Sequence, residues 1–174
     1  MSQSIIDFFL KTGEVERFPQ RGFVLRNAKN TVTVGAHNFR ESWMSWIIAK
    51  STDAGLDTGR LIKLGLVRDL CYGYAGDHTP YEPLIEKYKG KIPKSIFEKW
   101  VRLPKKEKEA FHKKEKKLRE KALNTLLKNL PPVFTNEIRN LWTEYEEGAT
   151  KEARFIRQVH MLENFMQALE HWDD

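Results

Sequence analysis

Apolar residues recur along this chain at spacings of three and four, which is the period of one face of an α-helix. No segment keeps the alternation of apolar and polar residues that is typical of a strand, so the fold class we expect is all-α. The pattern predicts a short helix from Ser4 to Leu10, closed by Gly13, and longer helices over residues 36–50, 57–70, 104–129, 136–147 and from 151 onward.

The segment from Asp57 to Leu70 has almost no polar face, so we expect it to be the central, buried helix. Arg68 and Asp69 stand side by side near its end. Because an unpaired buried charge is costly, such a pair requires a partner, a metal or a functional site around it. This dipeptide is therefore the first candidate for chemistry in the chain.

Pro and Gly interrupt the helical pattern in two places. Residues 17–35 are expected to form an ordered loop, and residues 80–117 a lysine-rich helical excursion from a single domain that spans residues 1–174. Further along, Pro131 is expected to end the basic helix, Thr135 or Asn136 to cap the next helix, and Gly148 to end it.

The net charge of +6 is concentrated in one segment. Pro104 to Lys121 holds nine Lys or Arg and four Glu, which alternate at helical spacings as on a solvated helix face. Few aromatic residues lie nearby to stack on bases, so we do not expect nucleic acid as a partner.

The composition, 40% hydrophobic and 31% charged, excludes a disordered or fibrous chain. No apolar run approaches the roughly 20 residues needed to cross a bilayer, so no membrane partner is expected. The first residues lack the pattern of a secretory signal, and we expect a cytoplasmic location. The single Cys71 can form neither an internal disulfide nor a zinc-finger site, and we expect it to fill the core.

Three side chains of metal-binding type fall on three different predicted helices, each beside an apolar stripe: His37, Asp69 and His160. Imidazole and carboxylate groups suit a divalent ion such as Mn, Co, Fe, Ni, Zn or Mg. A histidine beside an apolar face is also commonly a hydrogen-bonded core residue, so spacing alone leaves both interpretations open.

Four segments carry a family resemblance: RFPQRGFVLRN, TVTVGAHNFR, LGLVRDLCYGYAGDHTP and LWTEYEEGATKEARFIRQVHMLENFMQALEHW. They resemble the HD-domain superfamily of metal-dependent phosphohydrolases, within it the deoxynucleoside monophosphatase-like branch. The resemblance implies a helical bundle, commonly a homodimer, with a metal held between helices. It also implies that the ligand is a nucleotide or another phosphorylated small molecule.

Under this resemblance His37 is the first metal ligand and Asp69 is the aspartate of the His-Asp pair. Arg68, however, stands where the family has its second histidine, and His160 stands where it has its last aspartate. Tyr72 replaces the glutamate that normally serves the catalytic water. The resemblance thus implies a diverged metal site.

Other polar residues around this motif are candidates for substrate contacts. Asp77 remains as the second acidic residue of the motif and is our candidate catalytic acid or base. The resemblance implies that Arg17 contacts substrate, and Arg21 and Arg26 would add phosphate-binding charge. His78 is a candidate replacement ligand.

Arg68 decides between the hypotheses, because arginine has no free lone pair and carries a fixed charge. At ~4 Å and an effective dielectric of ~20, two unit charges interact by ~4 kcal/mol, and a dication about doubles that repulsion. A guanidinium can also grip a phosphate with two hydrogen bonds, which makes Arg68 a candidate substrate-binding residue.

Three hypotheses follow. In the first, His37, Asp69 and His160 hold one metal, Arg68 binds the substrate phosphate, and the protein hydrolyses a phosphomonoester such as a nucleoside monophosphate. In the second, Arg68 neutralises Asp69, metal is absent, and the chain is a catalytically inactive relative that binds a nucleotide or a protein partner. In the third, the pocket has no function and the basic helix contacts an acidic partner.

Overall fold

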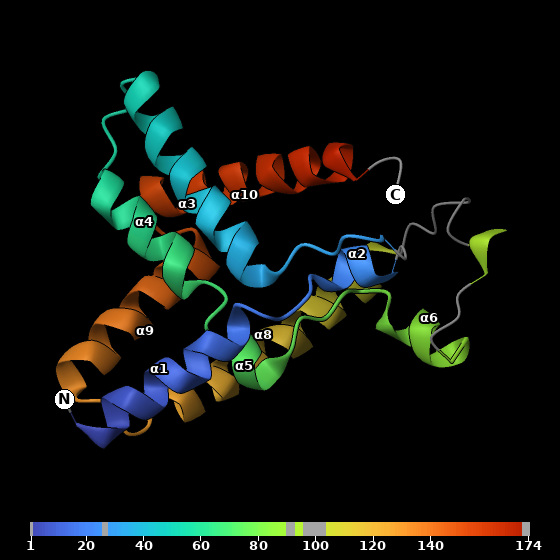
Figure 1. The fold of residues 1–174 in the computed structure, drawn as a ribbon, viewed down its shortest axis with the longest axis horizontal. Coiled ribbons are helices and arrows are strands. Elements are labelled where there is room, and N and C mark those ends of the chain that lie inside the picture. The colour runs from blue at the N-terminus through green and yellow to red at the C-terminus, as the bar shows by residue number, and fades with distance from the viewer. Residues whose placement is uncertain (1, 26–27, 90–92, 96–103, 172–174) are drawn as a thin grey trace.

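The structure, a computed structural model, describes residues 2–25, 28–89, 93–95 and 104–171. Within these ranges the chain forms helices joined by loops, with no strand beyond an isolated bridge between Pro19 and Thr33. The all-α prediction is confirmed. The helices in Figure 1 are α1 (Gln3–Val15), α2 (Arg21–Leu25), α3 (Val34–Ser51), α4 (Thr58–Val67), α5 (Tyr72–Ala75), α6 (Glu82–Lys87), α8 (Lys105–Leu127), α9 (Pro132–Glu147) and α10 (Lys151–Glu170).

Helices α3, α4 and α10 pack against one another in the upper part of the view in Figure 1. Local sequence sets where each begins. The side chains of Thr33, Asp57 and Thr150 each accept a hydrogen bond from the backbone N–H three residues later, which caps the three helices. These starts fix the register in which the inward faces of α3 and α10 meet.

The hydrophobic core lies between α4, α8, α9 and α10. Its fully buried side chains include Leu61 and Leu64 of α4, Leu123 and Leu127 of α8, and Ile156 of α10. Burying a leucine or isoleucine contributes roughly 1.5–3 kcal/mol, so these contacts account for much of the stability of this arrangement. Cys71 is also completely buried in this core, as the sequence predicted.

Two predicted helices differ from the structure at their beginnings. Helix α1 starts at Gln3 after Ser2 and continues past Gly13 to Val15, because one glycine inside a helix costs only about 1 kcal/mol. Helix α9 starts at Pro132, before the predicted caps Thr135 and Asn136. Proline is well tolerated in the first turn of a helix, where its missing N–H would have no partner.

The predicted loop at 17–35 contains the short helix α2, in which Phe23 and Val24 donate to the carbonyl of Gln20. Helix α4 ends at Val67, earlier than predicted, and Leu66 faces solvent. Tight turn hydrogen bonds, such as that from the Leu70 N–H to the Val67 carbonyl, continue the chain to α5. Arg68 and Asp69 therefore lie in a turn between two helices.

The basic helix predicted at 104–129 is α8, and most of its charged side chains are exposed. Of the excursion predicted at 80–117, residues 90–92 and 96–103 lie outside the described residues, and Glu82–Lys87 forms α6. No helix in the described parts of the chain is both long and apolar enough to span a membrane.

Candidate active site

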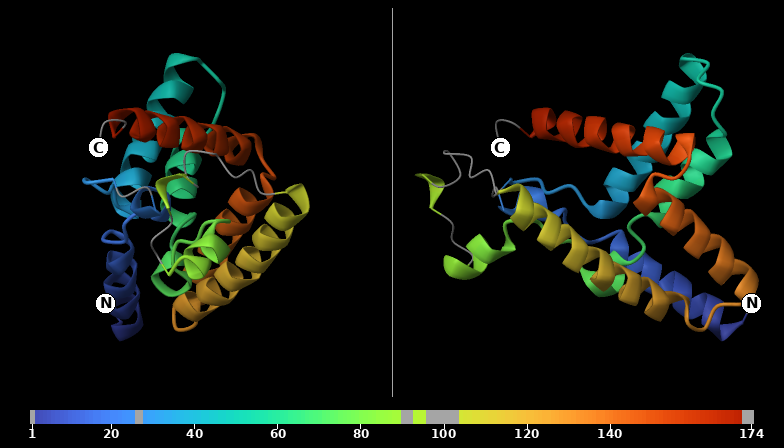
Figure 2. Two further views of the ribbon diagram at one scale, coloured as in Figure 1. Left: turned by 90° about the vertical axis from the view of Figure 1, so that its right-hand side faces the viewer. Right: turned by 180° about the vertical axis from the view of Figure 1, so that it is seen from behind.

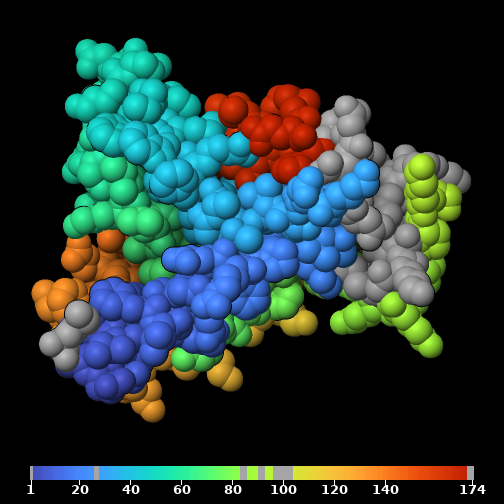
Figure 3. Space-filling view, viewed as in Figure 1, coloured from blue at the N-terminus to red at the C-terminus, as the bar shows by residue number. Residues whose placement is uncertain are grey.

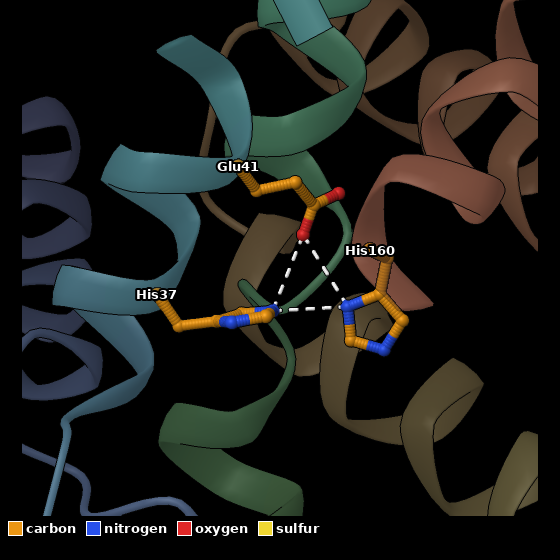
Figure 4. Close-up of side chains that lie close together, drawn as sticks. All are labelled: His37, Glu41 and His160. Carbon is orange, nitrogen blue, oxygen red and sulfur yellow. Dashed lines mark hydrogen bonds and ion pairs between the residues drawn. The ribbon is translucent and has the colours of Figure 1, made fainter. Parts of the chain in front are cut away.

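The site lies where α3 and α10 cross, beside the end of α4. His37 and Glu41 project from successive turns of α3 toward His160 of α10 (Figure 4). The Nε2 atom of His37 lies 2.9 Å from Nδ1 of His160 and 3.2 Å from Oε2 of Glu41. The same Glu41 oxygen lies 3.4 Å from Nδ1 of His160. Two imidazole nitrogens and one carboxylate oxygen thus converge.

A second carboxylate fixes the orientation of His37. Glu163 of α10, which is 0% exposed, pairs with Nδ1 of His37 and accepts a hydrogen bond from Nε of Arg40 at 2.8 Å. Arg40 also pairs with Glu170 at 2.6 Å. Because Glu163 accepts at Nδ1, the ring presents Nε2 to Glu41 and His160, which is the arrangement that supports a metal-binding histidine.

The guanidinium of Arg68 borders the same cluster, and its side chain is only 6% exposed. Its Nη2 atom pairs with Asp69 at 2.7 Å, and its Nη1 atom lies 2.6 Å from Nδ1 of His160. Guanidinium groups only donate, so Nδ1 of His160 is the acceptor of this contact. The remaining contacts of Arg68 are the Tyr145 hydroxyl at 3.0 Å, Oδ1 of Asn38 at 3.3 Å and Oε2 of Glu41 at 3.3 Å.

Burial and these neighbouring charges shift the pKa values of Glu41, His37 and His160. Burial opposes the charge of Glu41, but Arg68 and then the two imidazoles lower its pKa to about 2. Burial also opposes a charge on His37, yet Glu163 and Glu41 outweigh it and raise the pKa of His37. Burial and then Arg68 lower the pKa of His160, which keeps that ring neutral. The single guanidinium of Arg68 thus faces two carboxylates, those of Glu41 and Asp69.

A cavity of about 200 Å³ opens beside this cluster and is lined by His37, Arg68, Asp69 and His160. Asp77 also lines it. Burial raises the pKa of Asp77, although its Oδ2 accepts the Arg21 backbone N–H at 2.7 Å, which acts in the opposite direction. The cavity is also lined by Gln20 and by Tyr72, the residue at the position of the missing glutamate.

The structure brings His37, Arg68, Asp69 and His160 together, and places Asp77 on the same cavity. It does not bring Asp69 into the donor cluster, where Glu41 takes part instead. Asp69 pairs with Arg68, as the second hypothesis from the sequence requires.

The other candidates lie elsewhere. Arg17 is exposed and does not line the cavity. The Arg21 side chain pairs with Glu82 at 3.0 Å, and Arg26 lies outside the described residues. His78 lies 3.2 Å from Glu115 of α8 rather than beside the donor cluster.

Sequence reasoning missed Glu41 and Glu163. Both are completely buried, and both fall on the inward stripe of a helix. The available signal was the spacing: Glu41 follows His37 by four residues, and Glu163 follows His160 by three, so each carboxylate shares a helix face with a candidate histidine.

The donor cluster has the chemistry and spacing that a divalent ion requires. Metal bonds of about 2.0–2.2 Å that meet at about 90–110° place ligand atoms about 2.8–3.6 Å apart, a range that includes the three separations observed among His37, Glu41 and His160. The nearby Arg68 opposes an ion, because its Nη1 contacts the same nitrogen of His160. The donors fit a divalent ion, provided that the guanidinium moves away from His160.

Comparison with known proteins places this geometry in a family. The family model described as HD domain matches residues 14–174. The chain belongs to the HD-domain family. The resemblance described from the sequence implies departures from the family's pattern at Arg68, Tyr72 and His160.

Relatives named as 5'-deoxynucleotidases match nearly the whole chain. The human protein 5'-deoxynucleotidase HDDC2 is 28% identical over 172 residues, which is 99% of this chain and 70% of the human one. The zebrafish protein of the same name is 29% identical over 168 residues, covering 97% and 70% of the two chains. A conserved hypothetical protein of Pyrococcus furiosus has the same fold, with a TM-score of 0.64 and 21% identity over 95% of this chain and 83% of that one.

Proposed function

We propose that this protein is a nucleotide phosphohydrolase of the HD family that acts on a nucleoside monophosphate or a similar phosphomonoester, with a divalent ion at its site. The observation that carries the proposal is the convergence of donor atoms from His37, Glu41 and His160 at the wall of a cavity that also holds Arg68. The 5'-deoxynucleotidases that the chain resembles support the substrate class.

In this proposal His37, Glu41 and His160 hold the ion, which when bound would supply Lewis acidity and lower the pKa of a coordinated water. Arg68 turns from His160 and binds two phosphate oxygens of the substrate, which compensates for the metal ligand lost at its position. Asp77, whose pKa burial raises, carries the proton that the leaving oxygen takes up. Arg17 remains a candidate for a substrate contact.

A catalytically inactive, nucleotide-binding relative is the second candidate function. It is favoured by the contacts of Arg68, whose guanidinium is fully engaged by Asp69, Glu41 and His160 without any ion. In that case the guanidinium supplies the positive charge for phosphate, and no activated water forms.

One experiment separates the two functions. Protein purified without chelator is analysed for bound metal by inductively coupled plasma mass spectrometry, and then assayed with deoxynucleoside monophosphates in the presence of Mn or Co. The phosphohydrolase proposal expects about one ion per chain and release of phosphate. A His37→Ala variant is the control for hydrolysis by a contaminating phosphatase. Binding of nucleotide with neither metal nor turnover selects the inactive relative.

The proposal includes a homodimer, because α1, α3 and α4 border an apolar groove of about 840 Å³ (Figure 3 shows this face). Phe9 and Leu66 are more than half exposed there, and the Trp43 and Trp46 rings stack with centroids 5.2 Å apart. Exposed aromatic residues gathered along a groove are a common feature of protein–protein contact sites. Trp142, by contrast, lies in the core.

The oligomeric state is measured by light scattering during size-exclusion chromatography. A dimer is expected for the native chain, and Trp43→Glu should convert it to a monomer. Phe165→Glu, at an exposed aromatic residue of α10 outside the groove, is the matched control. A native chain that elutes as a monomer refutes the dimer. The proposed cytoplasmic location agrees with the single unpaired Cys71 and is tested by cell fractionation.

A further inference from the structure

A second cavity of about 520 Å³ lies between α8, α9 and α10, on the side of the molecule seen from behind in Figure 2. His160 lines both this cavity, called here the rear groove, and the smaller cavity of the candidate site. Tyr145, whose hydroxyl contacts Arg68, also lines the rear groove. His160 therefore borders both cavities, and Tyr145 connects the rear groove to Arg68 of the smaller cavity.

The rear groove carries excess positive charge. Arg119 pairs at 3.0 Å with Glu146, which also lines the groove. Arg154 donates to the carbonyls of Gly148 and Ala149 at the end of α9 and forms no ion pair with a carboxylate among the described residues. Within the part of the chain that the structure describes, no hydrogen bond or ion pair involves the Arg157 side chain, which is exposed at the same groove. Two guanidinium charges are thus available to an anion.

The two cavities differ in what they can hold. Sites for small molecules commonly enclose about 300–1,000 Å³. The cavity of about 200 Å³ beside His37 is therefore too small for a whole nucleotide, whereas the rear groove of about 520 Å³ is large enough. Asp69 lines the smaller cavity, and its carboxylate is unfavourable for a chain of phosphates. The rear groove has the opposite charge balance, with arginine in excess of glutamate.

We propose that the rear groove binds the phosphate chain of a nucleoside di- or triphosphate, with Arg157 and Arg154 as its main contacts. This inference rests on the proposed function, because it extends the class of nucleotides that the protein binds. Nucleotides with several phosphates are expected to bind more tightly than monophosphates. Each added phosphate brings further negative charge to guanidinium groups that can donate charge-assisted hydrogen bonds.

Inorganic tripolyphosphate tests the rear groove directly by isothermal titration calorimetry with the full chain in metal-free buffer. The native protein is expected to bind it, and Arg157→Ala to weaken binding by about tenfold, as expected for the loss of one charge-assisted contact. Arg157→Lys should recover part of the loss. Arg139→Ala on α9, outside the rear groove, removes the same charge and should leave binding unchanged. Absence of binding, or an Arg157→Ala variant equal to the native protein, overturns the proposal.

Nucleotides then separate this inference from the proposed function. Deoxyadenosine triphosphate is expected to bind about tenfold more tightly than the monophosphate, with a smaller ratio in Arg157→Ala. Equal affinities for the two nucleotides in the native protein overturn the role of the rear groove and leave the proposed function standing. Binding of tripolyphosphate without binding of either nucleotide overturns the proposed function, and with it the nucleotide assignment of the groove.

Discussion

The Nη1 atom of Arg68 lies 2.6 Å from Nδ1 of His160, the ring nitrogen that also faces His37 and Glu41. One nitrogen lone pair cannot accept this hydrogen bond and ligate an ion at the same time. Metal occupancy of the site is therefore coupled to the position of one buried guanidinium.

Replacing Arg68 by histidine should raise metal affinity. The substitution removes the positive charge beside the donor atoms and restores an imidazole at the position of the family's second histidine. We expect divalent-metal affinity to rise by about tenfold or more, equivalent to ~1.4 kcal/mol, with phosphatase activity rising in parallel. Calorimetric titration with Mn or Zn measures the first effect.

Arg60→His is the control for this substitution, because Arg60 lies at the other end of α4 and pairs with Glu144. Its metal affinity should equal that of the native chain. If Arg68→His leaves both metal affinity and hydrolysis at native values, Arg68 is not what limits the site.

The geometry also distinguishes Glu41 from Asp69. Glu41→Gln removes a donor oxygen from the cluster, whereas Asp69→Asn removes only the partner of Arg68. We expect Glu41→Gln to reduce metal affinity by about tenfold or more, and Asp69→Asn to reduce it less. Metal titrations on the two variants test this order, and the reverse order would restore Asp69 as the ligand that the sequence suggested.

Glu163 positions His37 rather than contacting substrate. Glu163→Gln should weaken metal binding by about 10–100-fold, the range found when the partner of a ligating histidine is lost. Glu170→Gln is the matched control, since Glu170 also pairs with Arg40 but does not contact His37. The NMR signals of the His37 ring should reveal a changed proton distribution in Glu163→Gln only. Equal metal affinities in the two variants contradict the positioning role.

Glu144 should make stability depend on pH. Hydrogen bonds from Arg60, together with one from Thr150, outweigh burial and lower the pKa of Glu144. Its folded pKa lies below the unfolded value of about 4.3, so the stabilisation is present above that value and is lost as the pH falls through the folded pKa.

At pH 7, Glu144→Gln should reduce the free energy of unfolding by about 1 kcal/mol, a modest value because the partly exposed Arg60 is screened by solvent. The difference from the native chain should shrink as the pH falls below about 4.3. Urea denaturation at several pH values measures it, with exposed Glu147→Gln as the control. A difference that stays constant down to the folded pKa would contradict the assignment.

Cys71 should be chemically inert in the folded protein. Burial, followed by the charge of Asp69, raises the pKa of its thiol to about 12, and its side chain is completely buried. Since the thiolate is the reactive form, Ellman's reagent should label Cys71 only after unfolding in guanidinium chloride. Rapid labelling of native protein would show that the core opens easily around α5.

The parts of the fold that the sequence predicted depend on local signals. Asp57 caps α4, Gly148 ends α9 in the left-handed conformation at φ +61°, and α10 begins at Lys151. Each signal acts within one helical turn, so the sequence is sufficient to read it. Helix α2 was missed because it spans only Arg21–Leu25, and the segment before it is held by the distant pairing of Pro19 with Thr33.

The candidate site was predicted only in part for a related reason. His37, Asp69 and His160 attracted attention as metal-binding residue types beside apolar stripes. Glu41 resembled a solvated charge, since only the crossing of α3 with α10 makes its side chain completely buried. An exposed carboxylate needs no partner, whereas a buried one indicates a partner or a functional site. Burial depends on how the helices assemble and cannot be read from the local sequence.

The imidazole ring of His160 lines both the smaller cavity of the candidate site and the rear groove. A ligand in either cavity contacts this ring, so a rotation of the ring that favours one ligand also changes the contacts available to the other. By thermodynamic linkage, the factor by which the first ligand changes the affinity for the second equals the factor by which the second changes the affinity for the first.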